Sequence, residues 1–143
     1  MTVEIREADG RPMLHIRALT ARALANDRLE AFEAGSLAWS GDVPIRRGHG
    51  TPAVLRGTPE WRDDRLEVVA AIPDTPEGRE LAEGVRSGEL AHASVEFNAT
   101  EERRERGVRI ITRGILDGIA LTSKPAYRTT RTELRSQRRR VFL

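Results

Sequence analysis

Short stretches in which apolar and polar residues alternate recur along most of the chain, and they restrict the fold more than any other feature. Residues 2–7 and 12–19 both alternate in this way, and Asp9-Gly10 between them is a hairpin-turn signal. Side chains two residues apart share one face of a strand, so this pattern predicts an antiparallel hairpin with one buried face.

The rest of the chain follows the same pattern, with one clear exception. Further strands are expected over 43–47, 53–57, 66–72, 93–99, 108–112 and 116–122, with turns at 61–64 and 101–107. Residues 30–40 are expected to form a short helix or turn. The exception is a helix that begins with Thr75 as N-cap and Pro76 in the first position and ends at Ser87-Gly88. About seven strands and one or two helices favour an α+β protein, mostly β, built on a closed or nearly closed barrel.

Length and charge indicate one domain with a distinct tail. The 143 residues contain no repeat and no linker, so a barrel domain is expected over 1–127 and a basic tail over 128–143. The tail holds six arginines and one glutamate, a net charge of +5, in a chain whose total is +2. Such a tail typically frays or binds an acidic partner, and its attraction to nucleic acid would be weak and independent of base sequence.

Several classes of function are excluded by what the chain lacks. There is no cysteine, which excludes disulfides, thiol nucleophiles and Cys-ligated zinc. Three histidines leave little material for a metal centre, so neither a metal nor a cofactor is expected. The longest apolar run, 68–72, is far short of the ~20 residues that span a bilayer, and no signal peptide is visible. A soluble, cytoplasmic-type protein with no membrane contact is expected.

A histidine and a serine stand out at strand ends. His49 lies between two glycines after the strand predicted over 43–47, where the backbone leaves an imidazole accessible. Ser94 lies near the start of a strand and shares a face with His92 and Glu96, while the intervening side chains point to the core. Each feature alone is also typical of a surface residue without function.

The order of the motifs along the chain carries a family resemblance. A histidine after a strand is followed by a Thr-x-x-Gly helix start, a Ser-Val-x-Phe strand and an apolar strand ending in Pro125-Ala126-Tyr127. This order resembles the prohead proteases of HK97-type tailed phages, which are capsid maturation serine proteases. Residues 30–37 are similar to that family's Glu-x-Phe-x-Pro-Gly-Ala-Phe segment, and the resemblance covers about residues 12–135.

The resemblance implies a fold similar to the herpesvirus assemblins and a serine endopeptidase activity. It implies that the chain processes the phage major capsid protein and scaffold, and possibly itself, inside the assembling procapsid in the host cytoplasm, with self-association expected. His49 takes the place of the family histidine and Ser94 that of the nucleophile. A serine hydroxyl becomes a good nucleophile when a nearby base accepts its proton, and histidine does this at neutral pH.

The third catalytic residue is the point at which this chain departs from the family. Gly118 stands where many members have a glutamate. Asp117 precedes it, and a β-bulge would be needed to turn its side chain to the same face. Glu96 is close to Ser94 on one strand, and Lys124 is the only lysine and could act as a base. The candidates, in order of preference, are Asp117, Glu96, Lys124 and His92.

Two other functions are compatible with the sequence. The glycine at position 118 would suit a protease-like protein without activity that serves as a scaffold or capsid-assembly factor. A small basic nucleic-acid-binding β-protein is the other alternative. The aromatic content of 4% and the absence of interleaved aromatic and basic residues argue against it, because single strands bind by stacking bases on aromatic rings.

Overall fold

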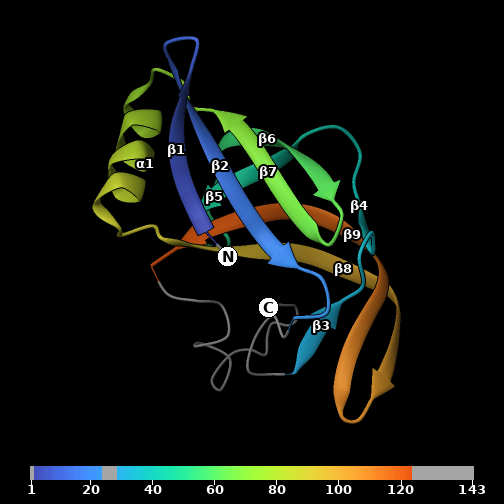
Figure 1. The fold of residues 1–143 in the computed structure, drawn as a ribbon. Coiled ribbons are helices and arrows are strands. Elements are labelled where there is room, and N and C mark those ends of the chain that lie inside the picture. The colour runs from blue at the N-terminus through green and yellow to red at the C-terminus, as the bar shows by residue number, and fades with distance from the viewer. Residues whose placement is uncertain (1, 24–28, 124–143) are drawn as a thin grey trace.

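Nine strands and one helix make up residues 2–23 and 29–123, the part of the chain that the computed structural model describes (Figure 1). Neighbouring strands follow the order β1-β2-β7-β6-β5-β9-β3, and β4 and β8 also pair with β9. The elements are β1 (Thr2–Ala8), β2 (Arg11–Thr20), β3 (Glu30–Phe32), β4 (Leu37–Ala38), β5 (Val43–Arg47), β6 (Ala53–Arg62), β7 (Arg65–Ala71), α1 (Pro76–Ser87), β8 (His92–Glu105) and β9 (Val108–Thr122).

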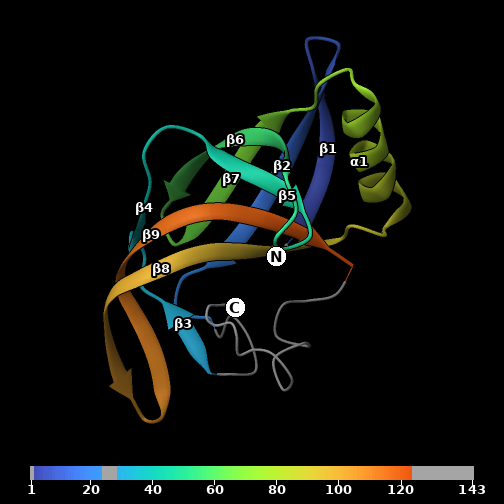
Figure 2. The same ribbon diagram turned by 180° about the vertical axis from the view of Figure 1, so that it is seen from behind.

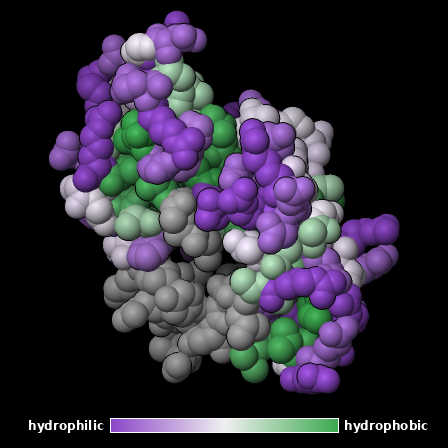
Figure 3. Space-filling view, viewed as in Figure 1, coloured by the Kyte–Doolittle hydropathy of each residue, from purple (hydrophilic) through white to green (hydrophobic). Residues whose placement is uncertain are grey.

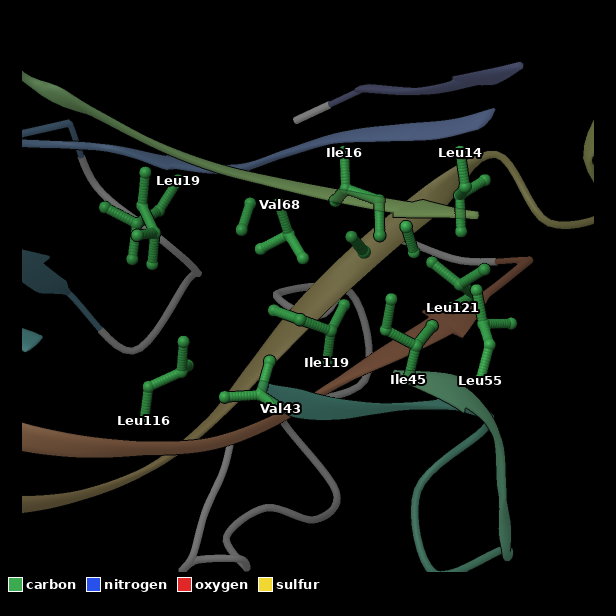
Figure 4. Packing of buried hydrophobic residues seen from close by; sticks show 14 of the residues in the cluster. Leu14, Ile16, Leu19, Val43, Ile45, Leu55, Val68, Leu116, Ile119 and Leu121 are labelled. Carbon is green, nitrogen blue, oxygen red and sulfur yellow. The ribbon is translucent and has the colours of Figure 1, made fainter. Parts of the chain in front are cut away.

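The sheet folds onto itself through β6. Residues 53–57 of β6 pair with β5, whereas residues 58–62 pair with β7, so this strand belongs to both halves. Apolar side chains of the two halves face each other and form one core. Figure 4 shows Leu14, Ile16 and Val68 of the β2–β7 half opposite Ile45 and Ile119 of the β5–β9 half, all of them almost fully buried.

A closed barrel is not confirmed, although a mostly β fold with a helix is. Within the described residues, β1 and β3 lie at the two ends of the strand path and do not pair with each other. The helix α1 lies beside β1 instead (Figure 1). Alternation along a strand indicates which side chains are buried, but it does not indicate whether the two edge strands pair with each other. The sequence pattern therefore could not predict whether the sheet closes into a barrel.

The open sheet leaves apolar side chains partly exposed at its margins. On the face shown in Figure 3, hydrophobic residues show between hydrophilic ones beside α1 and β1, and again near the β8–β9 hairpin. Val3 and Ile5 of the edge strand β1 are only partly covered while they pack against the core. Scattered exposure of this kind is ordinary for soluble domains.

Local signals predicted the first hairpin and the helix correctly. Asp9 and Gly10 both have positive φ values, 53° and 75°, as a tight hairpin turn requires. Thr75 caps α1, because its side-chain oxygen accepts a hydrogen bond from the Gly78 amide at 3.0 Å. Gly88 ends the helix in the left-handed conformation.

Of the short helix or turn predicted for residues 30–40, only a turn at Ala34-Gly35 is present; the segment forms mainly β3 and β4, which run parallel to β9. Non-local contacts override the local propensity here. Phe32 is 2% exposed and stacks edge-on against Phe97, with ring centroids 5.0 Å apart. The guanidinium of Arg109 donates to the Glu30 carboxylate, which is also buried. Both contacts join the segment to strands more than sixty residues later in the chain.

Three strands, β6, β8 and β9, are clearly longer than the sequence predicted. The segments expected as separate strands over 108–112 and 116–122 are one strand, β9, which has partners on both sides (Figures 1 and 2). Pairing with neighbouring segments keeps β9 continuous at Gly114, whose amide donates a hydrogen bond to the Ser36 carbonyl at 2.8 Å. The β8–β9 turn therefore shortens to Arg106-Gly107, and β6 continues to Arg62, which leaves Asp63-Asp64 as its turn.

The predicted tail 128–143, Lys124 and the Pro125-Ala126-Tyr127 motif lie outside the described residues. The division of the chain into a domain over 1–127 and a tail stays a prediction.

Replacing Arg109 by methionine is expected to lower the free energy of unfolding by about 3 kcal/mol, because the Glu30 carboxylate would stay buried without its guanidinium. The matched control is Arg113→Met on the same strand, since the Arg113–Glu101 pair is long, 3.9 Å, and exposed. That change is expected to cost less than about 1 kcal/mol. Denaturant unfolding of both variants measures the difference, and equal values would contradict a stabilising role for the Arg109–Glu30 pair.

Candidate active site

The candidate site lies on the face of β9 that points away from the core. Strand β9 is hydrogen-bonded to β8 on one side and to β5 on the other (Figure 2). Ser94 on β8, Ala120 on β9 and Arg46 on β5 are register partners in one row across these strands. The next row begins with Glu96, which is opposite Gly118. Small residues on the central strand therefore separate polar residues on the outer two.

Glu96 connects the two outer strands by a pair of contacts. Arg46 Nη1 donates to Glu96 Oε1 at 2.5 Å, and His49 Nδ1 lies 2.9 Å from Glu96 Oε2. The Glu96 side chain is 19% exposed and that of Arg46 26%, whereas the His49 ring is about half exposed. One carboxylate thus holds a guanidinium with one oxygen and an imidazole with the other.

A turn directly after β5 brings His49 to this carboxylate. The Gly48 amide donates to the Leu121 carbonyl at 3.0 Å, which ties the end of β5 to β9. The Thr51 hydroxyl donates to the Arg47 and Gly48 carbonyls at 3.1 and 2.9 Å and closes the turn. With Nδ1–H donated to Glu96, the lone pair of Nε2 is left free to accept a proton.

Ser94 lies in the Ser94–Ala120–Arg46 row, which is between the Glu96–Gly118 row and the turn that carries His49. It precedes Glu96 by two residues without an intervening bulge, so both side chains point to the same face, on the order of 7 Å apart at their Cα atoms. The imidazole comes from the turn after β5 and contacts Glu96, so it reaches over the strand face that also holds Ser94. Ser94 is 4% exposed, and no hydrogen bond joins it to His49 in the described residues. Catalytic hydrogen bonds commonly form only when the substrate is bound.

Asp117 lies next to this cluster at a β-bulge, the irregularity that the sequence analysis named as the condition for turning its side chain to this face. The β8–β9 register passes from Glu96–Gly118 to Phe97–Leu116, which leaves Asp117 without a partner on β8. Partial burial raises the pKa of Asp117, the Glu96 charge raises it further and the Arg46 charge lowers it. Within the described residues, no hydrogen bond or ion pair joins Asp117 to His49; the carboxylate in contact with the imidazole belongs to Glu96.

The remaining candidates and one missed residue complete the cluster. His92 begins β8 opposite Thr122, on the face of Ser94, and the structure shows no contact between it and His49 among the described residues. Arg46 was not singled out from the sequence. The signal that could have indicated it is its position: Arg46 lies in the strand that leads to His49, three residues before the histidine.

The structure of the described segments offers neither a metal site nor a membrane span. In residues 2–23 and 29–123, no group of three or more histidine, aspartate and glutamate side chains could hold a metal ion. The one helix found there is too short and too polar to cross a bilayer.

Replacing Asp117 by asparagine is expected to increase the free energy of unfolding slightly at pH 7. A carboxyl whose pKa is raised by folding resists ionisation in the native state, so its charge disfavours folding at every pH above that pKa. The gain, less than about 1 kcal/mol for a mostly exposed group, should be smaller at about pH 3.5, where the carboxyl is mostly protonated in both states. Unfolding curves at pH 3.5 and 7 measure it, and a destabilised variant at pH 7 would contradict the sign.

Comparisons with known proteins give a family match and a similar fold. The family model of the caudovirus prohead serine protease matches residues 30–141. The solved structure of the capsid assembly protease of bacteriophage T4, gp21, is similar in fold, with a TM-score of 0.51 and 15% sequence identity. The superposition covers 85% of this chain and 88% of that one. Among curated protein sequences, none matches this chain.

Proposed function

Because the chain belongs to the caudovirus prohead serine protease family, we propose that it is a serine endopeptidase that cleaves the major capsid protein and scaffold of its phage. The reaction takes place inside the assembling procapsid in the host cytoplasm, and self-cleavage is part of the same activity. The likeness in fold to a capsid assembly protease supports this proposal.

In the proposed mechanism, Ser94 is the nucleophile and His49 is the general base. Nε2 of His49 takes the proton of the Ser94 hydroxyl as Oγ attacks the scissile carbonyl. The tetrahedral intermediate collapses, the C–N bond breaks, and the leaving amine takes the proton back from the imidazolium. Water then attacks the acyl-serine, again with His49 as base, and releases the acid product and free Ser94.

Glu96 is the orienting acid in this proposal, in preference to Asp117. The single observation that carries the assignment is the 2.9 Å contact between Glu96 Oε2 and His49 Nδ1, on the strand face that also holds Ser94. A carboxylate at Nδ1 selects the tautomer with a free Nε2 and stabilises the imidazolium that forms during the reaction. With Glu96 in this role, the mechanism needs no carboxylate at position 118, where this chain has glycine and many family members have glutamate.

The proposal is tested by labelling the full chain with a fluorophosphonate, which forms a stable adduct with an activated serine. We expect one adduct per chain, located at Ser94 by peptide mass spectrometry, and no adduct on the unfolded protein. The labelling rate should rise with pH over the range in which imidazole loses its proton. No adduct under native conditions, together with no cleavage of a co-expressed capsid protein, would favour the inactive scaffold instead.

A further inference from the structure

We infer that Arg46 and Gly118 are positioning residues for the Glu96–His49 pair: Gly118 provides the space in which Glu96 crosses β9, and Arg46 holds the carboxylate there. This inference rests on the proposed function, since it concerns how the orienting acid is held. Neither residue contacts the bond to be cleaved in the proposed mechanism.

Gly118 leaves the space that the ion pair occupies. A β-carbon built at this position would lie 2.6 Å from Arg46 Nη1 and 2.6 Å from Glu96 Oε1. Both distances are well below van der Waals contact, so any side chain at position 118 would push the guanidinium and the carboxylate out of their present places. Glu96 and Gly118 are direct register partners, which explains why the glutamate side chain passes over this residue and no other.

Arg46 determines which way the carboxylate points. Glu96 has three rotatable side-chain bonds, and its Oε1 is held by Arg46 Nη1 from the far side of β9. With Oε1 held in this way, Oε2 faces the end of β5, where His49 Nδ1 contacts it. A guanidinium is charged at all relevant pH values, so this restraint does not change as the pH changes.

Arg46 also offsets the charge that His49 experiences. The charged and titratable groups around the Glu96 carboxylate are Arg46 from β5, His49 from the turn after it, Asp117 from the bulge in β9, and His92 two residues before Ser94 on β8. Without Arg46, the Glu96 carboxylate would face the imidazole with no guanidinium paired to it. Protonated His49, which cannot act as a base, would then persist to higher pH.

The test compares Arg46→Met with Arg46→Lys and with the control Arg47→Met, using the rate of fluorophosphonate labelling at Ser94 against pH. Arg46→Met should lower the plateau rate about 10- to 100-fold through loss of orientation. It should also move the midpoint of the acid limb up by about half a pH unit, the size expected for a unit charge on the order of 6 Å away in water.

The other two variants separate charge from geometry. Arg46→Lys keeps the positive charge but not the planar donor, so it should keep the midpoint and recover only part of the rate. Arg47 pairs at 3.5 Å with Glu80 of α1 and at 3.6 Å with Glu89 just after it, and within the described residues it makes no ion pair with Glu96. Arg47→Met should therefore match the parent in both plateau rate and midpoint.

Gly118→Ala tests the space over β9 independently of charge. The two nearest atoms are the ends of flexible side chains, and the third, the Pro44 carbonyl oxygen, would lie 3.2 Å away and need to move by only a few tenths of an ångström. The fold is therefore expected to persist, with an unfolding temperature within a few degrees of the parent. The labelling rate should fall at least about tenfold as the ion pair is displaced. An unchanged rate in both Gly118→Ala and Arg46→Met would overturn the inference. If the parent itself gives no Ser94 adduct, the proposed function fails instead, and the two failures are thereby distinguished.

Discussion

Replacing Ser94 by alanine is expected to lower peptide-bond hydrolysis at least about 10⁴-fold, because the alanine side chain has no oxygen to attack the scissile carbonyl. The fold should persist, since the change removes a single oxygen atom from a buried β8 side chain, adds no bulk and leaves no cavity larger than that atom. The measurement is cleavage of the capsid protein by the purified variant, with circular dichroism as the check on folding.

A matched control is available in Ser36. Both serines are 4% exposed, but Ser36 directly precedes β4, and within the described residues its hydroxyl has no hydrogen-bond partner. Ser36→Ala should keep full activity and gain up to about 1 kcal/mol in the free energy of unfolding, because a buried hydroxyl without a partner is unfavourable. Full cleavage by Ser94→Ala would end the serine-protease assignment at this residue.

Replacing Glu96 by glutamine is expected to lower kcat about 10²- to 10⁴-fold. Glutamine has nearly the same shape but cannot stabilise the imidazolium, and it presents either an amide or an uncharged carbonyl to His49 Nδ1. Slow labelling of Ser94 should remain, because the serine and histidine are intact.

Asp117→Asn is the comparison that assigns the acid. It removes one carboxylate from the same cluster without touching the contact at His49, so most of the activity should remain. If Asp117→Asn loses activity while Glu96→Gln keeps it, Asp117 is the orienting acid, as the sequence analysis ranked it. Retention of activity by both would indicate a serine–histidine pair without an orienting acid.

The sequence predicted those parts of the fold that depend on neighbouring residues. The β1–β2 hairpin follows from alternation around Asp9-Gly10, and α1 from Thr75 and Gly88 at its ends. Residues 30–40 were not predictable in this way, because β3 and β4 are strands only through their pairing with β9. The continuity of β9 across Gly114 has the same cause.

For the site, the sequence by itself determined the family and gave Ser94 and His49 as the candidate pair, whereas the bulge at Asp117, which the sequence named only as a condition, is a finding of the structure. Which carboxylate contacts His49 was decided by the tertiary structure, because the two residues are 47 positions apart and meet through the pairing of β9 with both β5 and β8. Arg46 enters the cluster for the same reason. Strand alternation determines the face on which a side chain lies, but the register between strands distant in sequence determines which side chains on that face come into contact.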